Sequence, residues 1–184
     1  MTSRDLDPVT RLTADAVGEP GDRTFYLQAA SGTEQVTLLV EKEQVRQLSE
    51  NLQAWLPELA AERPEDPEEA RAAETGDLDL TEPLEPDFRV GRLSLTYDPE
   101  RDRVVVSATE LVLAGEGEEE LPKPLEPEPR EVRLWVTRPQ LRVLAHHGSQ
   151  VVLRGRPLCP LCGNPLDPAG HICPALNGHR PSED

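Results

Sequence analysis

Several short stretches of the chain are rich in apolar and β-branched residues, with polar residues between them, as in half-buried β-strands. They are residues 25–29, 36–40, 90–97, 104–113 and 132–136. Ser31 and Gly32, which favour turns, separate the first two, and the polar run 98–103 separates the next two. The pattern therefore predicts two β-hairpins and a fifth strand.

Two stretches instead show the helical spacing of three and four residues. The first carries apolar residues at 45, 48, 52, 55 and 56, and Pro57 lies where this helix could end or kink. The second follows Thr137, a good N-cap residue, with Pro139 in its first turn. Its apolar residues stand at 141, 144, 151 and 152. The sequence thus predicts a helix after the second strand and another after the fifth.

These two strand–helix junctions resemble each other. Residues 36–48 and 132–144 share the pattern V-x-L-x-V-x₃-Q-x-R-x-L, with six identities at a constant offset of 96. A chance match is the alternative, since any strand followed by an amphipathic helix can show V-x-L-x-V. With a duplication, we expect an α+β domain over 20–154. Two similar hairpin/strand-helix units would form a mainly antiparallel sheet with helices on one face.

Most of the net charge of −16 lies in two segments. Residues 57–88 carry 12 acids and 2 bases, and residues 115–131 carry 7 acids and 2 bases. Because both are rich in Pro and Glu and poor in apolar residues, we expect solvated acidic insertions. A docking surface for a basic partner is the alternative, and nucleic acid is disfavoured because its phosphates would be repelled. Residues 1–19 are expected to be a flexible N-terminus.

Membrane and secretory segments are not expected. No apolar run reaches the roughly 18 residues of a membrane-spanning helix. Residues 1–30 lack the basic start and apolar stretch of a secretory signal. We therefore expect a cytoplasmic protein whose thiols stay reduced.

All three cysteines lie near the C-terminus, within 15 residues. Cys159-Pro-Leu-Cys162 is followed by Gly163, as in zinc knuckles, and two thiolates at this spacing fit adjacent corners of a tetrahedron. Cys173 starts a second half in which Leu176 stands where a fourth cysteine would complete the site.

The fourth ligand must then be a histidine. His171 is favoured slightly because it closes the shortest loop, and His179 is the runner-up. A closed site with three cysteines and one histidine is structural, so we expect a zinc module over 155–180 and a tail at 181–184. A redox CPLC pair and a catalytic zinc are weaker alternatives.

Residues 23–29, 155–174 and 177–179 also carry a resemblance. With RTFYLQA, GRPLCPLCGNPLDPAGHICP and NGH, the chain resembles an uncharacterised actinobacterial family, a domain of unknown function. The resemblance covers nearly the whole chain and implies no activity. It implies a pathway shared with a kinase-like and a histidine-phosphatase-like protein, since the family's genes tend to lie near theirs.

We expect a non-enzymatic binding or adaptor protein that acts on a protein partner. The alternative is an enzyme or enzyme subunit for a phosphorylated small molecule, with the basic residues of 133–156 as anion ligands. That alternative requires a concave pocket lined by several arginines. In the pair His146-His147, we expect one side chain to face the core or the sheet and the other to face solvent.

Overall fold

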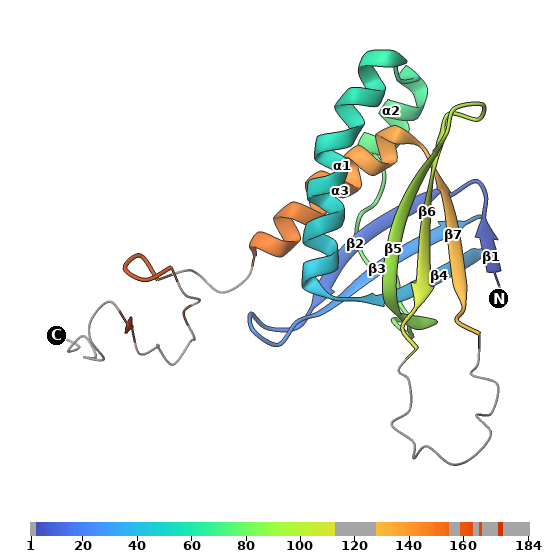
Figure 1. The fold of residues 1–184 in the computed structure, drawn as a ribbon. Helices are drawn as coiled ribbons and strands as arrows, with labels where there is room; N and C mark the ends of the chain where they lie inside the picture. The colour runs from blue at the N-terminus through green and yellow to red at the C-terminus, as the bar shows by residue number, and fades with distance from the viewer. Residues whose placement is uncertain (1–2, 113–127, 155–158, 164–165, 167–172, 175–184) are drawn as a thin grey trace, which may run out of the picture.

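A computed structural model describes residues 3–112, 128–154, 159–163, 166 and 173–174 of the chain. It has an α+β fold, as the sequence predicts, with seven strands in one sheet and three helices in the described part (Figure 1). The elements are β1 (Ser3–Leu6), β2 (Arg11–Val17), β3 (Thr24–Ser31), β4 (Glu34–Val40), α1 (Lys42–Glu62), α2 (Pro67–Glu74), β5 (Phe88–Asp98), β6 (Arg103–Glu110), β7 (Glu131–Val136) and α3 (Arg138–Leu153).

The sheet consists of two antiparallel meanders, β2-β3-β4 and β5-β6-β7, in the order β1-β7-β6-β5-β4-β3-β2. The meanders meet where β4 and β5 run parallel, and only Leu38–Phe88 and Leu39–Arg89 pair there. β1 adds a second parallel pairing beside β7. The sheet is therefore mainly antiparallel, as expected, with a short seam at its centre.

The two ends of the sheet curl toward each other. β1 and β2 stand at opposite ends of the strand order, yet only residues 7–10 connect them. In this connection the Val9 N–H donates to the Trp135 carbonyl in β7 at 3.1 Å, and the Thr10 N–H donates to the Ala30 carbonyl in β3 at 2.8 Å. The connection thus links both meanders.

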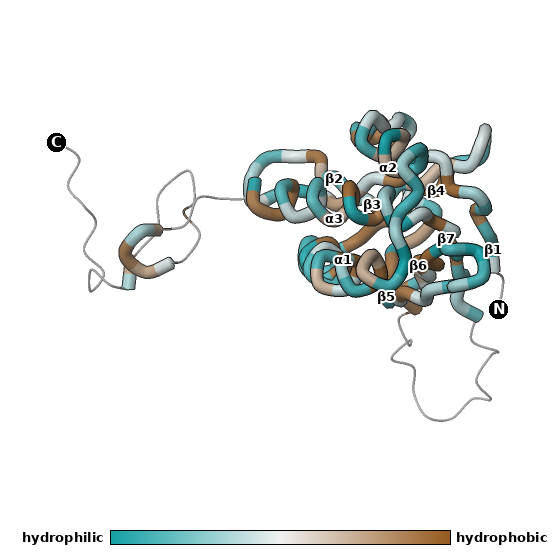
Figure 2. Tube along the Cα trace, turned by 90° about the horizontal axis from the view of Figure 1, so that it is seen from above, coloured by the Kyte–Doolittle hydropathy of each residue, from teal (hydrophilic) through white to brown (hydrophobic). Residues whose placement is uncertain are grey.

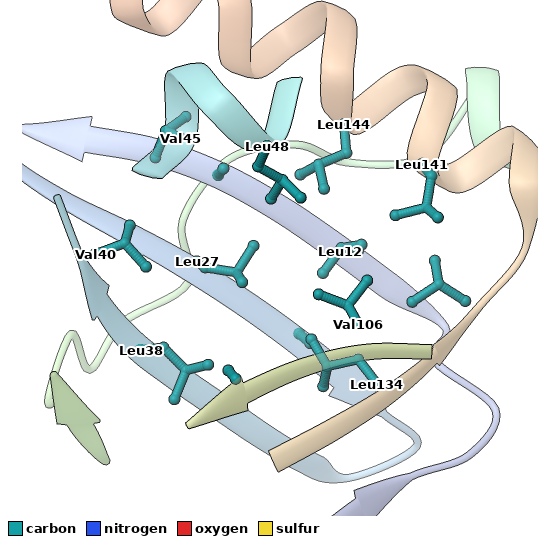
Figure 3. Close-up of a cluster of buried hydrophobic side chains, with 14 of the residues drawn as sticks. Leu12, Leu27, Leu38, Val40, Val45, Leu48, Val106, Leu134, Leu141 and Leu144 are labelled. Atoms are coloured by element: carbon teal, nitrogen blue, oxygen red, sulfur yellow. The ribbon is translucent and has the colours of Figure 1, made fainter. Parts of the chain in front are cut away.

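α1 and α3 lie side by side and cover one face of the sheet (Figure 2). Inward residues of the strands, such as Leu27 and Leu134, face Leu48 of α1 and Leu144 of α3 (Figure 3). All four are buried. Burying a leucine fully contributes about 1.5–3 kcal/mol, so this layer dominates the stability of the fold.

The structure bears out the two similar units and extends them. Each long helix starts with a capping box, in which the Gln44 side chain accepts from the Glu41 N–H at 2.9 Å and Gln140 accepts from the Thr137 N–H at 3.0 Å. Gln44 then donates to the Val90 carbonyl at 3.1 Å, and Gln140 donates to that of Val9 at 2.9 Å. Each unit is a three-stranded meander followed by a helix, and each helix is tied to the start of the other meander.

The prediction of a flexible N-terminus at 1–19 is wrong, because β1 and β2 occupy most of these residues. Leu6, Val9, Leu12 and Ala14 are all buried in the common core. Their burial offsets the entropy of ordering this segment, so it forms part of the sheet.

The acidic segment 57–88 also differs from a solvated insertion. α1 continues through Pro57 to Glu62, because Leu56 and Leu59 on either side pack against the core and outweigh the hydrogen bond lost at proline. α2 then begins at Pro67, and its N-cap Asp66 accepts from two backbone N–H groups.

Residues 77–87 cross the sheet face opposite the helices. Gln28, fully buried on that face, donates to the Thr81 carbonyl at 2.9 Å and accepts from the Thr81 N–H at 2.9 Å. The first acidic segment is therefore bound to the domain. Of the second, 115–131, residues 115–127 lie outside the described residues.

Candidate metal centre

The three cysteines come together at one place. The Sγ atoms of Cys159, Cys162 and Cys173 all lie within 4.8 Å of one another. Cys159 and Cys173 are buried, and Cys162 is half-buried. Cys162 and Cys173 thus lie close together although eleven positions separate them in the sequence.

The turn from Cys159 to Gly163 brings the side chains of Cys159 and Cys162 close together. The Gly163 N–H donates to the Cys159 carbonyl at 2.9 Å, and Gly163 has a φ of +71°. This left-handed conformation is open to glycine at no steric cost and strained for other residues. The glycine that the motif predicts is therefore needed for the turn.

Backbone N–H groups point at the sulfur of Cys159. Those of Cys162 and then Leu161 hold the pKa of the Cys159 thiol below its ordinary value, because they hydrogen-bond to the thiolate. A thiolate, not a thiol, is the form that binds a metal. The turn thus prepares Cys159 as a ligand.

The separation of Cys159 and Cys173 fits a tetrahedral metal site. The Sγ atoms of Cys159 and Cys173 are 3.8 Å apart. That is far longer than the roughly 2.05 Å of a disulfide. It equals the separation of about 3.8 Å between two corners of a tetrahedron with metal–sulfur bonds of about 2.3 Å. Three cysteine thiolates in this arrangement can hold one metal ion.

The two candidate histidines, His171 and His179, lie outside the described residues. In the part of the chain that the structure describes, the metal-binding group consists of the three cysteines alone.

A comparison with known protein families shows which family the chain belongs to. Residues 4–173 match the family described as "Protein of unknown function (DUF3090)". The chain belongs to this family. The matched span of this DUF3090 chain includes the sheet, the helices and all three cysteines, and it contains His171 but not His179. The searches of curated proteins and of solved structures found no match.

The histidine pair of this DUF3090 chain divides as predicted. His147 Nε2 lies 3.2 Å from Asp15 Oδ2 of β2, with 13% of its side chain exposed. His146 is exposed and contacts Gln150 one turn later. Neither belongs to a metal-binding group among the described residues.

The arginines of 133–156 are dispersed. Arg133 pairs with Asp5 at 2.7 Å, and Arg142 pairs with Glu65 at 3.1 Å. Arg138, at the start of α3, is buried. Arg138 and Arg142 stand one turn apart in α3, but the three arginines engage separate carboxylates. Arg156 lies outside the described residues.

Arg138 forms an ion pair that the sequence analysis missed. Its guanidinium donates twice to the Asp102 carboxylate, at 2.8 Å each, and to the Arg63 carbonyl at 2.8 Å. Asp102 also accepts from the Tyr97 hydroxyl at 2.8 Å. These bonds tie the β5–β6 turn to the ends of α1 and α3, so the cluster is structural.

Within the described part of the chain, no helix is long and apolar enough to cross a membrane.

Proposed function

We propose that Cys159, Cys162 and Cys173 bind one zinc ion, with His171 as the fourth ligand and His179 as the alternative. The approach of the three sulfurs within 4.8 Å carries this proposal. Zinc suits a site of thiolates and imidazole, and four protein ligands make a closed, structural site. The family match favours His171, because its span ends at Cys173 and leaves His179 outside.

The fourth ligand is tested by zinc titration against a chromophoric chelator. Reduced chain carrying His171→Asn should lose at least about tenfold in zinc affinity, because loss of a mere hydrogen-bond partner of a ligand already costs about 10–100-fold, whereas His179→Asn should not. Loss of affinity in His179→Asn alone would reverse the assignment. Unchanged affinity in both would remove histidine from the site.

We further propose that the protein is a non-enzymatic binding or adaptor protein of the cytoplasm, with a protein partner. The enzyme alternative requires several arginines around one concave anion site. Arg133, Arg138 and Arg142 instead form ion pairs with separate carboxylates. This arrangement favours a role in which the zinc module and the sheet domain present surfaces to another polypeptide.

The kinase-like and phosphatase-like proteins implied by the family resemblance are the first partners to test. The tagged chain is cross-linked in its host, which the resemblance predicts to be an actinobacterium, and the cross-linked peptides are sequenced. We expect this chain to capture one partner protein, and that partner, used as bait in turn, to capture this chain. A chain that turns over a phosphorylated metabolite, and is cross-linked to no polypeptide, would contradict it.

A further inference from the structure

β5 has an open edge beside α1. The strand pairs with β6 from Val90 to its end, but with β4 only at Phe88 and Arg89. β4 ends at Val40, where the chain turns into α1. Beyond Arg89, no described strand pairs with this edge. Alternate residues of an edge strand direct their N–H and C=O groups outward, so this edge offers a row of main-chain donors and acceptors.

A groove of about 390 Å³ runs between this edge and the helix. Residues 91–95 line one side. Gln44, Gln47, Leu48 and Asn51 of α1 line the other. Five residues of an extended chain span about 17 Å, so the groove is as long as a short β-strand.

The repeat relates the α1–β5 groove to the interface between α3 and β2, and the two differ. α3 packs along β2, and His147 contacts Asp15 across that interface at 3.2 Å. In the α1–β5 interface, Asn51 is equivalent to His147, by the offset that relates Gln44 to Gln140. Thr96 is equivalent to Asp15, by the offset that relates Val90 to Val9. Both Asn51 and Thr96 are exposed. The edge that a helix covers in β2 is therefore open along residues 91–95 of β5, and α1 reaches the strand again where Trp55 meets the Tyr97 ring edge to face.

The charge of the groove is opposite to that of the chain. The protein carries a net charge of −16, yet no carboxylate lines this groove. Arg92 on its rim is exposed and forms no ion pair with a described residue, whereas Arg89 on the same strand pairs with Glu41 at 3.2 Å. An acidic ligand therefore meets an arginine that no described carboxylate pairs with. The carboxylate beside the lining is that of Glu43, which accepts from Gln47 Nε2 at 2.8 Å and is itself paired with Arg46.

We propose that the β5–α1 groove binds an extended, acidic segment of a partner protein, which adds to the sheet as a strand on the open edge of β5. The proposal rests on the binding function proposed above and names its site. The main chain of the segment bonds to β5, a carboxylate pairs with Arg92, and the amide of Asn51 meets its far side. Because α1 closes that side, a single strand fits, whereas a second copy of the sheet does not.

The test uses a fluorescein-labelled peptide of about nine residues that alternates valine or threonine with glutamate. Its binding to the full chain is measured by anisotropy. We expect Arg92→Glu to weaken binding at least about tenfold, through loss of a charged hydrogen bond, and Asn51→Trp to do the same by filling the groove. Glu58→Trp, on an exposed position of α1 outside the groove, is the matched control and should leave binding unchanged.

A second peptide with proline at its centre separates strand addition from charge attraction. It lacks a main-chain donor and should bind at least about tenfold more weakly. Bound peptide should also slow amide hydrogen exchange within residues 91–96. Equal binding of both peptides, or binding that ignores Arg92→Glu and Asn51→Trp, would overturn the proposal.

Three other results would also overturn it, each in a distinct way. A wild-type dimer that Asn51→Trp dissociates in sedimentation would assign the groove to a second copy. Peptide binding only after deletion of residues 113–127 would assign it to the chain itself. A partner cross-linked at another surface, with no peptide binding, would remove this site and keep the proposed binding function. Absence of any cross-linked polypeptide would instead remove that function.

Discussion

Gln53 of α1 donates through Nε2 to the hydroxyl of Ser149 in α3, at 2.8 Å, and these two residues occupy equivalent positions of the repeat. They are separated by 96 positions, the interval that also separates Gln44 from Gln140. Equivalent turns of the two helices therefore meet at their crossing. The contact shows that the two units face each other through the same part of their helices.

Close approach of the helices at this crossing depends on Gly148. A Cβ at this position would lie 2.6 Å from the Ser49 Oγ and 3.3 Å from a methyl group of Val45. Alanine gains up to about 1 kcal/mol in helix propensity, but overpacking costs about 1–3 kcal/mol. We expect Gly148→Ala to lower the free energy of unfolding by about 1 kcal/mol in urea titrations, and Gly148→Val to lower it further.

The Ser49→Ala background supplies the control for this prediction. Removing the hydroxyl makes room for the new methyl group, so Gly148→Ala should cost less there than in the wild type. An increase in stability from the single change Gly148→Ala would show that the helices are not in close contact.

The buried ion pair of Arg138 makes a stronger prediction. Arg138 is 2% exposed, and Arg138→Met would leave the Asp102 carboxylate partly buried without its main partner. Loss of one partner of a buried pair costs about 3–5 kcal/mol, which we expect in the free energy of unfolding. Arg142→Met, at a site where 45% of the side chain is exposed, should cost less than about 1 kcal/mol. Equal effects of the two changes would contradict the structural role of Arg138.

The same pair predicts a dependence on pH. Burial raises the pKa of Asp102, but the hydrogen bonds from Arg138 and then Tyr97 outweigh it and hold the pKa below the ordinary value of 3.8. A carboxylate with a lowered pKa stabilises the fold above pH 3.8, and this stabilisation is lost as the pH falls through its folded-state value.

Asp102→Asn tests this dependence while tolerating the left-handed φ of +50° at this position. We expect the stability difference between wild type and variant to be constant above about pH 5 and to shrink below pH 3.8. A difference that grows on acidification would have the wrong sign. Since both chains carry the same cysteines, release of a bound metal in acid affects them alike.

Attachment of residues 77–87 to the sheet depends on Gln28, which bonds to both main-chain groups of Thr81 and to the Thr37 hydroxyl. Gln28→Leu removes these bonds, so we expect a loss of about 1–3 kcal/mol and faster hydrogen exchange at the Thr81 amide. Gln47→Leu, at an exposed position of α1, should change neither quantity. Unchanged exchange at Thr81 in the Gln28 variant would show that other contacts hold the segment.

The strands and helices with strong apolar patterns were predictable from the sequence, and β2 was not. β6 carries three consecutive valines, β7 begins with alternating charged and apolar residues, and both long helices carry cap and spacing signals. In β2, by contrast, Thr13 is as fully buried as its neighbour Ala14, because residues 77–87 cover its outer face. A strand buried on both faces by small and polar residues shows no alternation of polarity.

α2 carried a local signal that the acidic composition masked. Asp66-Pro67-Glu68-Glu69 is a helix N-terminus by its cap residue, its proline and its first-turn acids. The Arg138 cluster had no such signal, because its partners come from the β5–β6 turn and the end of α1. At the candidate site, spacing predicted the three cysteines, whereas the choice between His171 and His179 stays a prediction because loop length alone permits both.

The central claim, that the cysteines bind zinc, is tested most directly by the metal content of chain purified without added metal. Wild type and Cys173→Ser are compared by elemental analysis, with Arg154→Ser as an exposed control outside the cysteine cluster. The account predicts about one zinc per chain in wild type and in the control, and much less in Cys173→Ser, which lacks one of the usual four ligands. Freshly reduced wild-type chain without zinc, or zinc retained equally by Cys173→Ser, would contradict it.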